Sequence, residues 1–214
     1  MTEDRWRVAL PDLSIDMDGV LCRPPLWFNL VISRDIRHEP DTRLRPRLGD
    51  ARLPRALAMR ILDSHAVQLV RYDLRRPMPE VAAGLAALAE VRRLVLLSGR
   101  PRSALKATER WLIRHGLRDF FSEIVLNDRG LSNAAFKLTV VRERDIRQHV
   151  DDDGRVAYFL SRDEPRSVFL IAWRRNRGLP YPPTVHRVRN LLEVAFLLRG
   201  ENSPMVDSIG PVVT

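Results

Sequence analysis

Residues 13–20 read LSIDMDGV, a short apolar run that ends in two aspartates and a glycine. If the run is a strand, alternate side chains share a face, so Asp16 and the incoming Asp18 approach one small volume while Met17 turns back into the core. Gly19 frees the backbone to turn sharply just beyond them. Two carboxylates this close repel each other, and such a pair is stable only around a cation or a shared proton. The alternative is a solvated Asp-Gly turn after an edge strand.

Two further polar clusters follow predicted strands. Residues 93–97 are a continuous apolar run of the kind buried in a parallel sheet, and residues 98–101, Ser-Gly-Arg-Pro, are predicted to form the turn after it. A short strand at residues 149–150 runs into three consecutive aspartates, residues 151–153. Parallel sheets bind ligands beyond the carboxyl ends of their strands. We therefore expect the three clusters to meet at one edge of a sheet.

The remaining chain alternates helical and strand patterns. This alternation indicates a parallel sheet with right-handed crossovers and helices on both faces, an α/β fold of the Rossmann-like kind. Helices are predicted over 79–90, 101–115, 134–147, 155–162 and 184–199, and further strands over 123–126 and 168–172.

Residues 21–76 differ from the rest in composition. They are punctuated by prolines, contain more arginines than acidic residues, and hold two predicted helices, near 26–36 and 54–70. We interpret this segment as a helical cap inserted into the core rather than as an independent domain. The predicted organisation is a core of residues 1–20 and 77–199, the cap, and a loose tail of residues 200–214.

Composition narrows the functional classes. The 214 residues fit one domain with an insertion, and an apolar content of 45% suffices for a core. No window of 18 apolar residues occurs, which predicts no membrane span. The single cysteine, Cys22, excludes an internal disulfide, is expected to be buried, and fits a reducing, cytoplasmic location. The net charge of +9 favours nucleic acid only weakly, because 36 basic residues include just two lysines, Lys106 and Lys137, and arginine is enriched throughout.

Each candidate residue also has a structural interpretation. Ser98 could simply cap a helix, although a Ser-Gly turn at a helix N-terminus also offers a hydroxyl and backbone N–H groups to an anion. Arg100 could hold a phosphate or lie in solvent. The acidic run 151–153 could be a solvated loop, but its position beyond a strand end, opposite another acidic pair, favours a hard cation. Lys137 would by default be a surface lysine, yet its ammonium could neutralise both a phosphate and a carboxylate.

Four motifs resemble, in order and spacing, those of the haloacid dehalogenase superfamily of phosphohydrolases: residues 16–20, residues 98–101, Lys137 and residues 151–152. The resemblance implies a Rossmann-like core whose cap is inserted between the first and second motifs. Within the superfamily, the C-terminal part looks like the 5′-deoxynucleotidase-type and polynucleotide-3′-phosphatase-like branches. The residues that carry this finer likeness are 109–112, 115–116, 173–177 and 188–190.

The resemblance implies a role for each matching residue. Asp16 would be the nucleophile that forms an aspartyl-phosphate, and Asp18 the general acid for the leaving oxygen and then the base for water. Such chemistry suits these residues, because phosphoryl transfer needs positioning and charge neutralisation, and a carboxylate is an adequate covalent relay. The catalytic set is Asp16, Asp18, Ser98 and Lys137, and the substrate-binding set is Ser98, Gly99, Arg100 and Lys137.

The resemblance also implies Mg²⁺ as cofactor. Asp16, the backbone carbonyl of Asp18, and Asp151 would hold the ion, with Asp152 in support. The third aspartate of the run, Asp153, leaves the ligand register open among the three.

The sequence therefore favours a Mg²⁺-dependent phosphomonoester hydrolase acting on a small phosphorylated metabolite such as a nucleotide. One alternative is a phosphatase of polynucleotide 3′ ends that uses the basic cap, although the arginines there are interleaved with acidic residues. Another is a non-catalytic protein that keeps the fold to bind an anion, against which the complete motif set argues. No membrane partner is expected, and the sequence does not indicate the oligomeric state.

Overall fold

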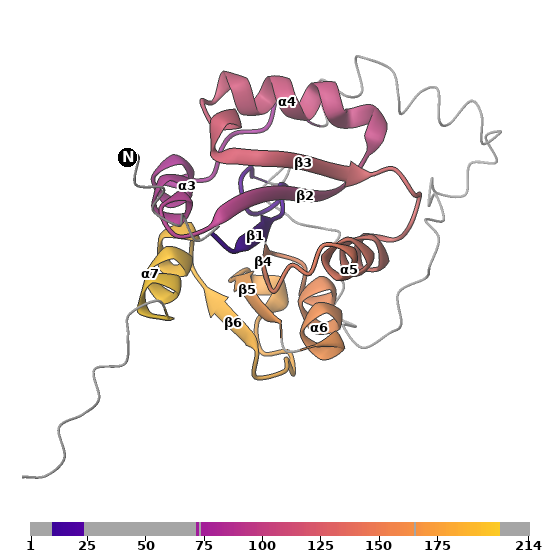
Figure 1. Ribbon diagram of the computed structural model, residues 1–214, viewed down its shortest axis with the longest axis vertical. Coiled ribbons are helices and arrows are strands. Elements are labelled where there is room, and N and C mark those ends of the chain that lie inside the picture. The colour runs from indigo at the N-terminus through magenta and orange to yellow at the C-terminus, as the bar shows by residue number, and fades with distance from the viewer. Residues whose placement is uncertain (1–9, 24–71, 73, 165, 202–214) are drawn as a thin grey trace, which may run out of the picture.

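The computed structural model describes residues 10–23, 72, 74–164 and 166–201. These residues form a six-stranded, entirely parallel sheet with the strand order β3-β2-β1-β4-β5-β6, flanked by helices (Figure 1). The predicted Rossmann-like fold is confirmed. The two predicted cap helices and the tail beyond residue 201 lie outside the described residues. The strands are β1 (Asp12–Ile15), β2 (Arg93–Pro101), β3 (Phe121–Asn127), β4 (Gln148–Asp151), β5 (Ser167–Ile171) and β6 (Val185–Val188).

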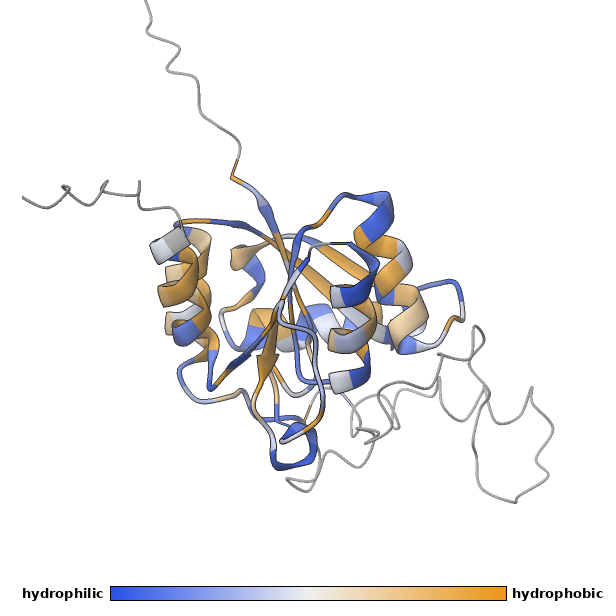
Figure 2. Ribbon diagram, turned by 90° about the horizontal axis from the view of Figure 1, so that it is seen from below, coloured by the Kyte–Doolittle hydropathy of each residue, from blue (hydrophilic) through white to orange (hydrophobic). Residues whose placement is uncertain are grey.

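Two helical layers cover the sheet, and their apolar sides face it (Figure 2). One hydrophobic cluster joins α3, α4 and α7 to one face, and a second joins α5 and α6 to the other. None of the described helices has the length and apolar character needed to cross a bilayer. The helices are α3 (Val81–Ala89), α4 (Leu105–Arg114), α5 (Asn133–Glu143), α6 (Gly154–Asp163) and α7 (Leu191–Glu201).

The alternation of side chains along β1 decides where the polar residues go. Leu13 and Ile15 pack into the cluster of α3, α4 and α7, so Ser14 faces the opposite side, which α5 and α6 cover. The same parity places Val150 of β4 in the first cluster and His149 on the α5 and α6 side. The two central strands therefore present polar side chains to the same helices.

The structure corrects the predicted helix 184–199. Residues 185–188 instead form β6, an edge strand that pairs with β5, and the helix begins only at Leu191. A four-residue strand with one fully buried side chain, Val188, is too short for periodicity to distinguish it from a first helical turn. Asn190, whose Oδ1 accepts the Glu193 N–H at 3.1 Å, marks the true helix start.

The predicted turn at residues 98–101 is also different. The strand β2 continues through these residues to Pro101, with its register against β3 shifted between Ser98 and Pro101. A short 3₁₀ helix, Arg102–Ala104, then leads into α4. The irregular end of β2 turns Arg100 toward β1, which matters for the site below.

Candidate active site

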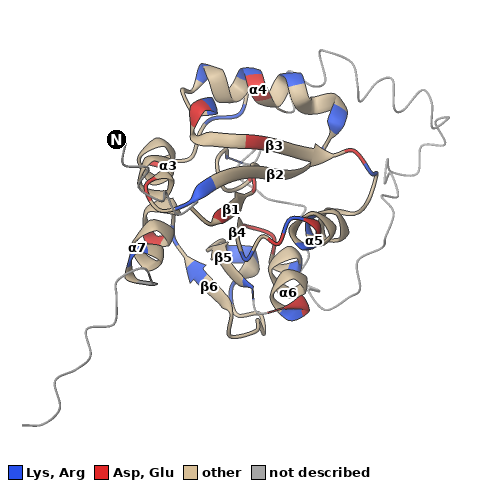
Figure 3. Cartoon of the chain, viewed as in Figure 1, with Lys and Arg blue, Asp and Glu red and all other residues tan. Residues whose placement is uncertain are grey.

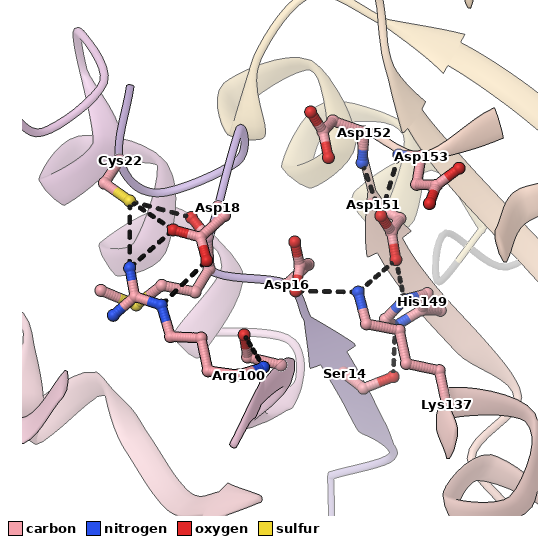
Figure 4. A network of polar contacts seen from close by, with 12 residues as sticks. Ser14, Asp16, Asp18, Cys22, Arg100, Lys137, His149, Asp151, Asp152 and Asp153 are labelled. Atoms are coloured by element: carbon pink, nitrogen blue, oxygen red, sulfur yellow. Dashed lines mark hydrogen bonds and ion pairs between the residues drawn. The ribbon is translucent and has the colours of Figure 1, made fainter. Parts of the chain in front are cut away.

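The site is built around one buried lysine at the carboxyl ends of β1 and β4. Asp16 directly follows β1, and its N–H continues the ladder by donating to the Val150 carbonyl at 2.9 Å. Lys137 projects from α5 with no exposed side-chain surface. Its Nζ lies 2.8 Å from Oδ1 of Asp16 and 2.7 Å from Oδ2 of Asp151 (Figure 4). One ammonium thus joins the first and last acidic motifs.

Asp151 is the hub of this arrangement, because its oxygens receive four donors. Oδ2 accepts from Lys137 and lies 2.7 Å from Nε2 of His149, and Oδ1 accepts the backbone N–H groups of Asp152 and Asp153, each at 2.9 Å. Burial raises the pKa of Asp151, but the charge of Lys137 and the bond from His149 outweigh it and hold the pKa well below its usual range. A carboxylate offers about four acceptor sites, so Asp151 is committed to this network.

Asp152 reaches the site from the other side. A Cβ built on Gly19 would stand 2.0 Å from Oδ2 of Asp152, so the carboxylate lies directly over the Gly19 backbone, which has φ +88°. The fully buried Asn176 fixes this turn, because its Nδ2 donates to the Asp152 carbonyl at 3.1 Å and to the Ile171 carbonyl of β5 at 2.8 Å. The glycine after the first acidic motif is therefore needed for space as well as for conformation.

Three carboxylates gather there with too little positive charge. Asp16, Asp151 and Asp152 are buried, and each offers one oxygen within 4.8 Å of the others. Burial, together with the charge of Asp151, raises the pKa of Asp16 to about 7, even though Lys137 opposes the shift. Burial and the charges of Asp151 and Asp16 raise the pKa of Asp152 well above its usual range.

Both shifts come from burial first and then from neighbouring negative charge that Lys137 does not fully compensate. A divalent cation that prefers oxygen ligands would supply the missing positive charge, so these residues fit Mg²⁺. The oxygens of Asp151 already hold four donors, and which of the three carboxylates would hold the ion stays a prediction. Asp153 instead caps α6 by accepting the Arg155 N–H at 2.9 Å.

Asp18 is held apart from the acidic trio. Arg100 donates two hydrogen bonds to the Asp18 carboxylate, from Nε to Oδ2 at 2.8 Å and from Nη2 to Oδ1 at 2.6 Å. Arg75 forms a short ion pair with Oδ1 of Asp18. The Cys22 thiol, buried as expected, also donates to Oδ1 at 3.2 Å. Burial raises the pKa of Asp18, but the charges and bonds of Arg100 and Arg75 outweigh it and hold the pKa far below its usual range. The side chain is thus ionised, and the predicted metal contact of Asp18, through its backbone carbonyl, stays a prediction.

Within the second motif, Ser98 and Arg100 are buried, and Arg100 alone contacts Asp18. Ser98 is buried, and its Oγ accepts the Arg100 N–H at 3.4 Å. The third guanidinium nitrogen of Arg100, Nη1, donates to Thr108 of α4 at 3.1 Å, so all its nitrogens have partners in this structure. Gly99 has no room for a side chain, because a Cβ would stand 2.2 Å from Oδ1 of Asn133 at the start of α5.

Sequence reasoning missed several residues of this network. Arg75 lies at the end of the proposed cap, where it was one arginine among many. Ser14 and His149 are polar residues inside strands, and they are register partners in the β1–β4 pairing. A buried polar residue in an otherwise apolar strand was the available signal, but it shows only once the pairing of the strands is known.

Comparisons with known proteins bear on the fold. No family model matches the chain, and no curated protein matches its sequence. Among solved structures, it is similar to a haloacid dehalogenase-like family hydrolase from Streptococcus pneumoniae, with TM-score 0.58 and 13% identity over 88% of this chain and 98% of that chain. It is also similar to CbbY from Rhodobacter sphaeroides in complex with phosphate, with TM-score 0.56 and 16% identity over 86% and 96% of the two chains.

A third similar structure is a dehalogenase by name. It is L-2-haloacid dehalogenase from Xanthobacter autotrophicus with chloropropionic acid covalently bound, with TM-score 0.53 and 15% identity over 90% of this chain and 99% of that chain. Identities this low show a shared fold. They confirm the predicted superfamily resemblance at that level, and the deoxynucleotidase-like branch stays a prediction.

Proposed function

We propose that this chain, which has the fold of the haloacid dehalogenase superfamily, is a Mg²⁺-dependent hydrolase of phosphomonoesters. The observation that carries the proposal is the position of Asp16, buried between the Lys137 ammonium and two further carboxylates that one ammonium cannot neutralise. A buried carboxylate nucleophile, a cluster that fits a cation, and a second carboxylate two residues on are groups that phosphoryl transfer through a covalent intermediate can use.

The balance of charge supports a phosphate substrate. With a divalent cation bound, the three carboxylates of the trio are neutralised by the ion together with Lys137. Beside them, Asp18 is bound by two arginines, Arg75 and Arg100, which leaves one positive charge in excess. An incoming phosphate dianion therefore meets a site that is neutral on one side and positive on the other.

The reaction follows from these positions. The carboxylate of Asp16 attacks phosphorus, the ester P–O bond breaks, and the leaving oxygen takes up a proton to become an alcohol. Water then attacks the aspartyl-phosphate while Asp18 accepts a proton from it, which releases inorganic phosphate and restores Asp16. Lys137 holds Asp16 in place throughout, and Mg²⁺, when bound, neutralises charge on the phosphoryl oxygens.

The ionised state of Asp18 favours one half of this cycle. An ionised carboxylate is ready to accept a proton from water, whereas donating a proton to the leaving oxygen requires Asp18 to be protonated against the pull of two arginines. Esters whose leaving oxygen needs no proton, such as aryl phosphates, should therefore react faster than alkyl phosphates.

Dehalogenation fits the site less well. It displaces a halide from carbon, a step that calls for neither a divalent cation nor a proton for the leaving group. The under-neutralised trio and the clamped Asp18 would then have no task in that step. Hydrolysis of an ester of phosphoric acid uses both.

For the substrate, we propose a small phosphorylated metabolite, with a nucleotide first. Among the described residues, Lys and Arg on α4 and α6 are mixed with acidic residues (Figure 3). These two helices therefore give no continuous track for a polyanion. The arginines of the proposed cap lie outside the described residues, apart from those near its ends.

A substrate panel with Mg²⁺ and with EDTA tests the proposal. It should contain p-nitrophenyl phosphate, mononucleotides, sugar phosphates, a 3′-phosphorylated oligonucleotide and L-2-chloropropionate, with Asp16→Asn as the inactive control. We expect Mg²⁺-dependent release of inorganic phosphate from the small esters. Chloride release from chloropropionate would replace the proposal with a dehalogenase, and a strong preference for the oligonucleotide would move it to nucleic-acid ends.

A further inference from the structure

A buried Ser–His pair lies beneath Asp151, and the reaction described above does not use it. Oγ of Ser14 is 2.7 Å from Nδ1 of His149, and Nε2 of the same ring is 2.7 Å from Oδ2 of Asp151 (Figure 4). Ser14 is fully buried and His149 is 1% exposed. The pair therefore forms the start of a continuous chain of contacts that runs through Asp151 and Lys137 to Asp16.

The direction of these hydrogen bonds follows from counting protons. The ionised Asp151 can only accept, so Nε2 of His149 carries the hydrogen that faces it. With Nε2–H facing Asp151, Nδ1 of the neutral ring is an acceptor, and Ser14 donates to it at 2.7 Å. The alternative acceptor for the Ser14 hydroxyl, the Gln148 carbonyl, is at 3.4 Å and thus much farther away.

The shared oxygen of Asp151 is what links the pair to the site. Oδ2 of Asp151 is contacted both by His149 and by Lys137. The bond from His149 fixes Oδ2 of this carboxylate, whose Oδ1 is held by two backbone N–H groups, and the Lys137 ammonium, at the end of a flexible four-carbon stem, takes its position from Oδ2.

We propose that Ser14 and His149 are positioning residues, whose hydrogen bonds fix the Asp151 carboxylate and thereby hold the Lys137 ammonium against Asp16. The neighbouring side chains on this face of the sheet, such as Leu97 and Val168, are apolar. A Ser–His pair in this space carries a desolvation cost that an apolar pair would avoid. Its hydrogen bonds lead to Asp151, so the pair connects directly to the site. The kinetic part of this inference rests on the proposed phosphatase function.

Two amide substitutions separate positioning from packing. In His149→Gln, the amide nitrogen corresponds to Nε2 of the ring and can still donate to Asp151. In His149→Asn, the amide oxygen corresponds to Nδ1, so the contact with Ser14 is kept and the donor to Asp151 is lost. Both variants remove the imidazole, so a role in packing alone predicts no preference for the variant that keeps the Asp151 donor.

The first readout is kinetic, with p-nitrophenyl phosphate and Mg²⁺. We expect His149→Asn to lower kcat by roughly 10- to 100-fold at a KM close to that of the wild type, the usual size of effect for partners that orient a site residue. His149→Gln should recover most of this loss. Equal losses in the two variants, or a wild-type kcat in His149→Asn, would overturn the proposal.

A second readout does not depend on activity. The chain contains two lysines, Lys106 and Lys137, and only the second is buried. In protein labelled with ¹⁵N-lysine, Lys137 should give one slowly exchanging ammonium signal, which shifts or is lost in His149→Asn and stays in His149→Gln. An unchanged signal in His149→Asn contradicts positioning. A wild-type protein that hydrolyses no phosphate ester would instead contradict the phosphatase and leave this test intact.

Ser14→Ala covers the case in which the histidine variants do not fold. Ring-¹⁵N histidine spectra of the wild type should show a protected Nε2–H on His149, and Ser14→Ala should shift the Nδ1 resonance while keeping that proton. A wild-type ring protonated at Nδ1 would overturn the assigned chain of hydrogen bonds.

Discussion

The Lys137 ammonium lies 2.8 Å from Oδ1 of Asp16, and the carboxylate it meets is at most 7% exposed. The same ammonium also serves Asp151, at 2.7 Å. Burial, together with the charge of Asp151, raises the pKa of Asp16 even though the ammonium that the two carboxylates share opposes the shift. The site therefore has a nucleophile that is well placed but incompletely neutralised, and the predictions below follow from that deficit.

Lys137→Met should abolish most activity and weaken the fold. Removing the ammonium leaves two buried carboxylates without their shared partner, and breaking a buried pair in this way costs about 3–5 kcal/mol. The measurement is the rate with p-nitrophenyl phosphate together with the free energy of unfolding in urea. Lys106→Met, at an exposed position of α4, is the matched control and should change stability by no more than about 0.5 kcal/mol. Wild-type turnover in Lys137→Met would refute the role of the ammonium.

Magnesium should stabilise the protein more at alkaline than at acid pH. Burial, with the charge of Asp151, raises the pKa of Asp16 from 3.8 to about 7, so the stability contributed by its protonated form is lost as pH rises between those values. Asp152 shifts in the same direction. Protons and Mg²⁺ then compete for the same carboxylate oxygens. The Mg²⁺-induced rise in Tm should therefore be larger at about pH 8 than at about pH 5.

Thermal unfolding with Mg²⁺ and with EDTA measures this difference. Contributions from Asp18 and Asp151, whose pKa values are lowered, occur under both conditions and largely cancel. Asp152→Asn should remove most of the response to Mg²⁺. A rise in Tm that is equal at both pH values, or larger in acid, would show that the acidic trio is not the cation site.

Gly19→Ala should disrupt the cation site through a clash. Its Cβ would stand 2.0 Å from Oδ2 of Asp152, which must move. Gly116→Ala is the matched control, because Gly116 also has a positive φ, +66°, but nothing lies within 4 Å of the added carbon. Both variants should lose about 1–3 kcal/mol through backbone strain. Only Gly19→Ala should weaken Mg²⁺ binding by calorimetry, and equal affinities in the two variants would contradict the placement of Asp152.

Arg75→Gln should change which esters the enzyme prefers. Removing one of the two arginines raises the pKa of Asp18, so the carboxyl group keeps its proton to higher pH and donates it more readily to an alkyl leaving oxygen. The rate for an alkyl phosphate relative to p-nitrophenyl phosphate should increase, and its alkaline limb should move to higher pH. The neighbouring exposed Arg76, changed to Gln, should leave the ratio as in the wild type. An unaltered ratio in Arg75→Gln would remove Asp18 as the proton donor.

Much of the fold could be predicted because periodicity is a local property. The apolar run of β2 and the strand that ends in Asp151 are visible in the sequence, and their alternation with helices determines a parallel sheet. The edge strand β6 was missed because a single buried side chain, Val188, cannot establish the alternating apolar pattern of a strand. The end of β2 was predicted as a turn because its register shift depends on β3, which the local sequence does not contain.

The candidate site, like the fold, has parts that the sequence predicts and parts that it does not. Asp16, Lys137 and the run at 151–153 belong to motifs, and the structure brings them together. The different contacts of the individual aspartates were not predictable, because they depend on hydrogen bonds made across the sheet. Asp151 accepts from four donors, whereas Asp152 lies against Gly19. The ion pairs of Arg75 and Arg100 with Asp18 likewise could not be predicted from the sequence, because they depend on the end of β2 and residue 75 meeting beside β1.

The central claim is that Asp16 carries the phosphoryl group, and intact-mass spectrometry of Asp18→Asn tests it most directly. With p-nitrophenyl phosphate the first step needs no proton from residue 18, whereas hydrolysis of the intermediate needs its base, so the variant should accumulate one phosphoryl group. Peptide mapping should place that group on Asp16, and the double variant with Asp16→Asn should remain unmodified. Phosphate release by Asp16→Asn at the wild-type rate, or an adduct on any other residue, would contradict the account.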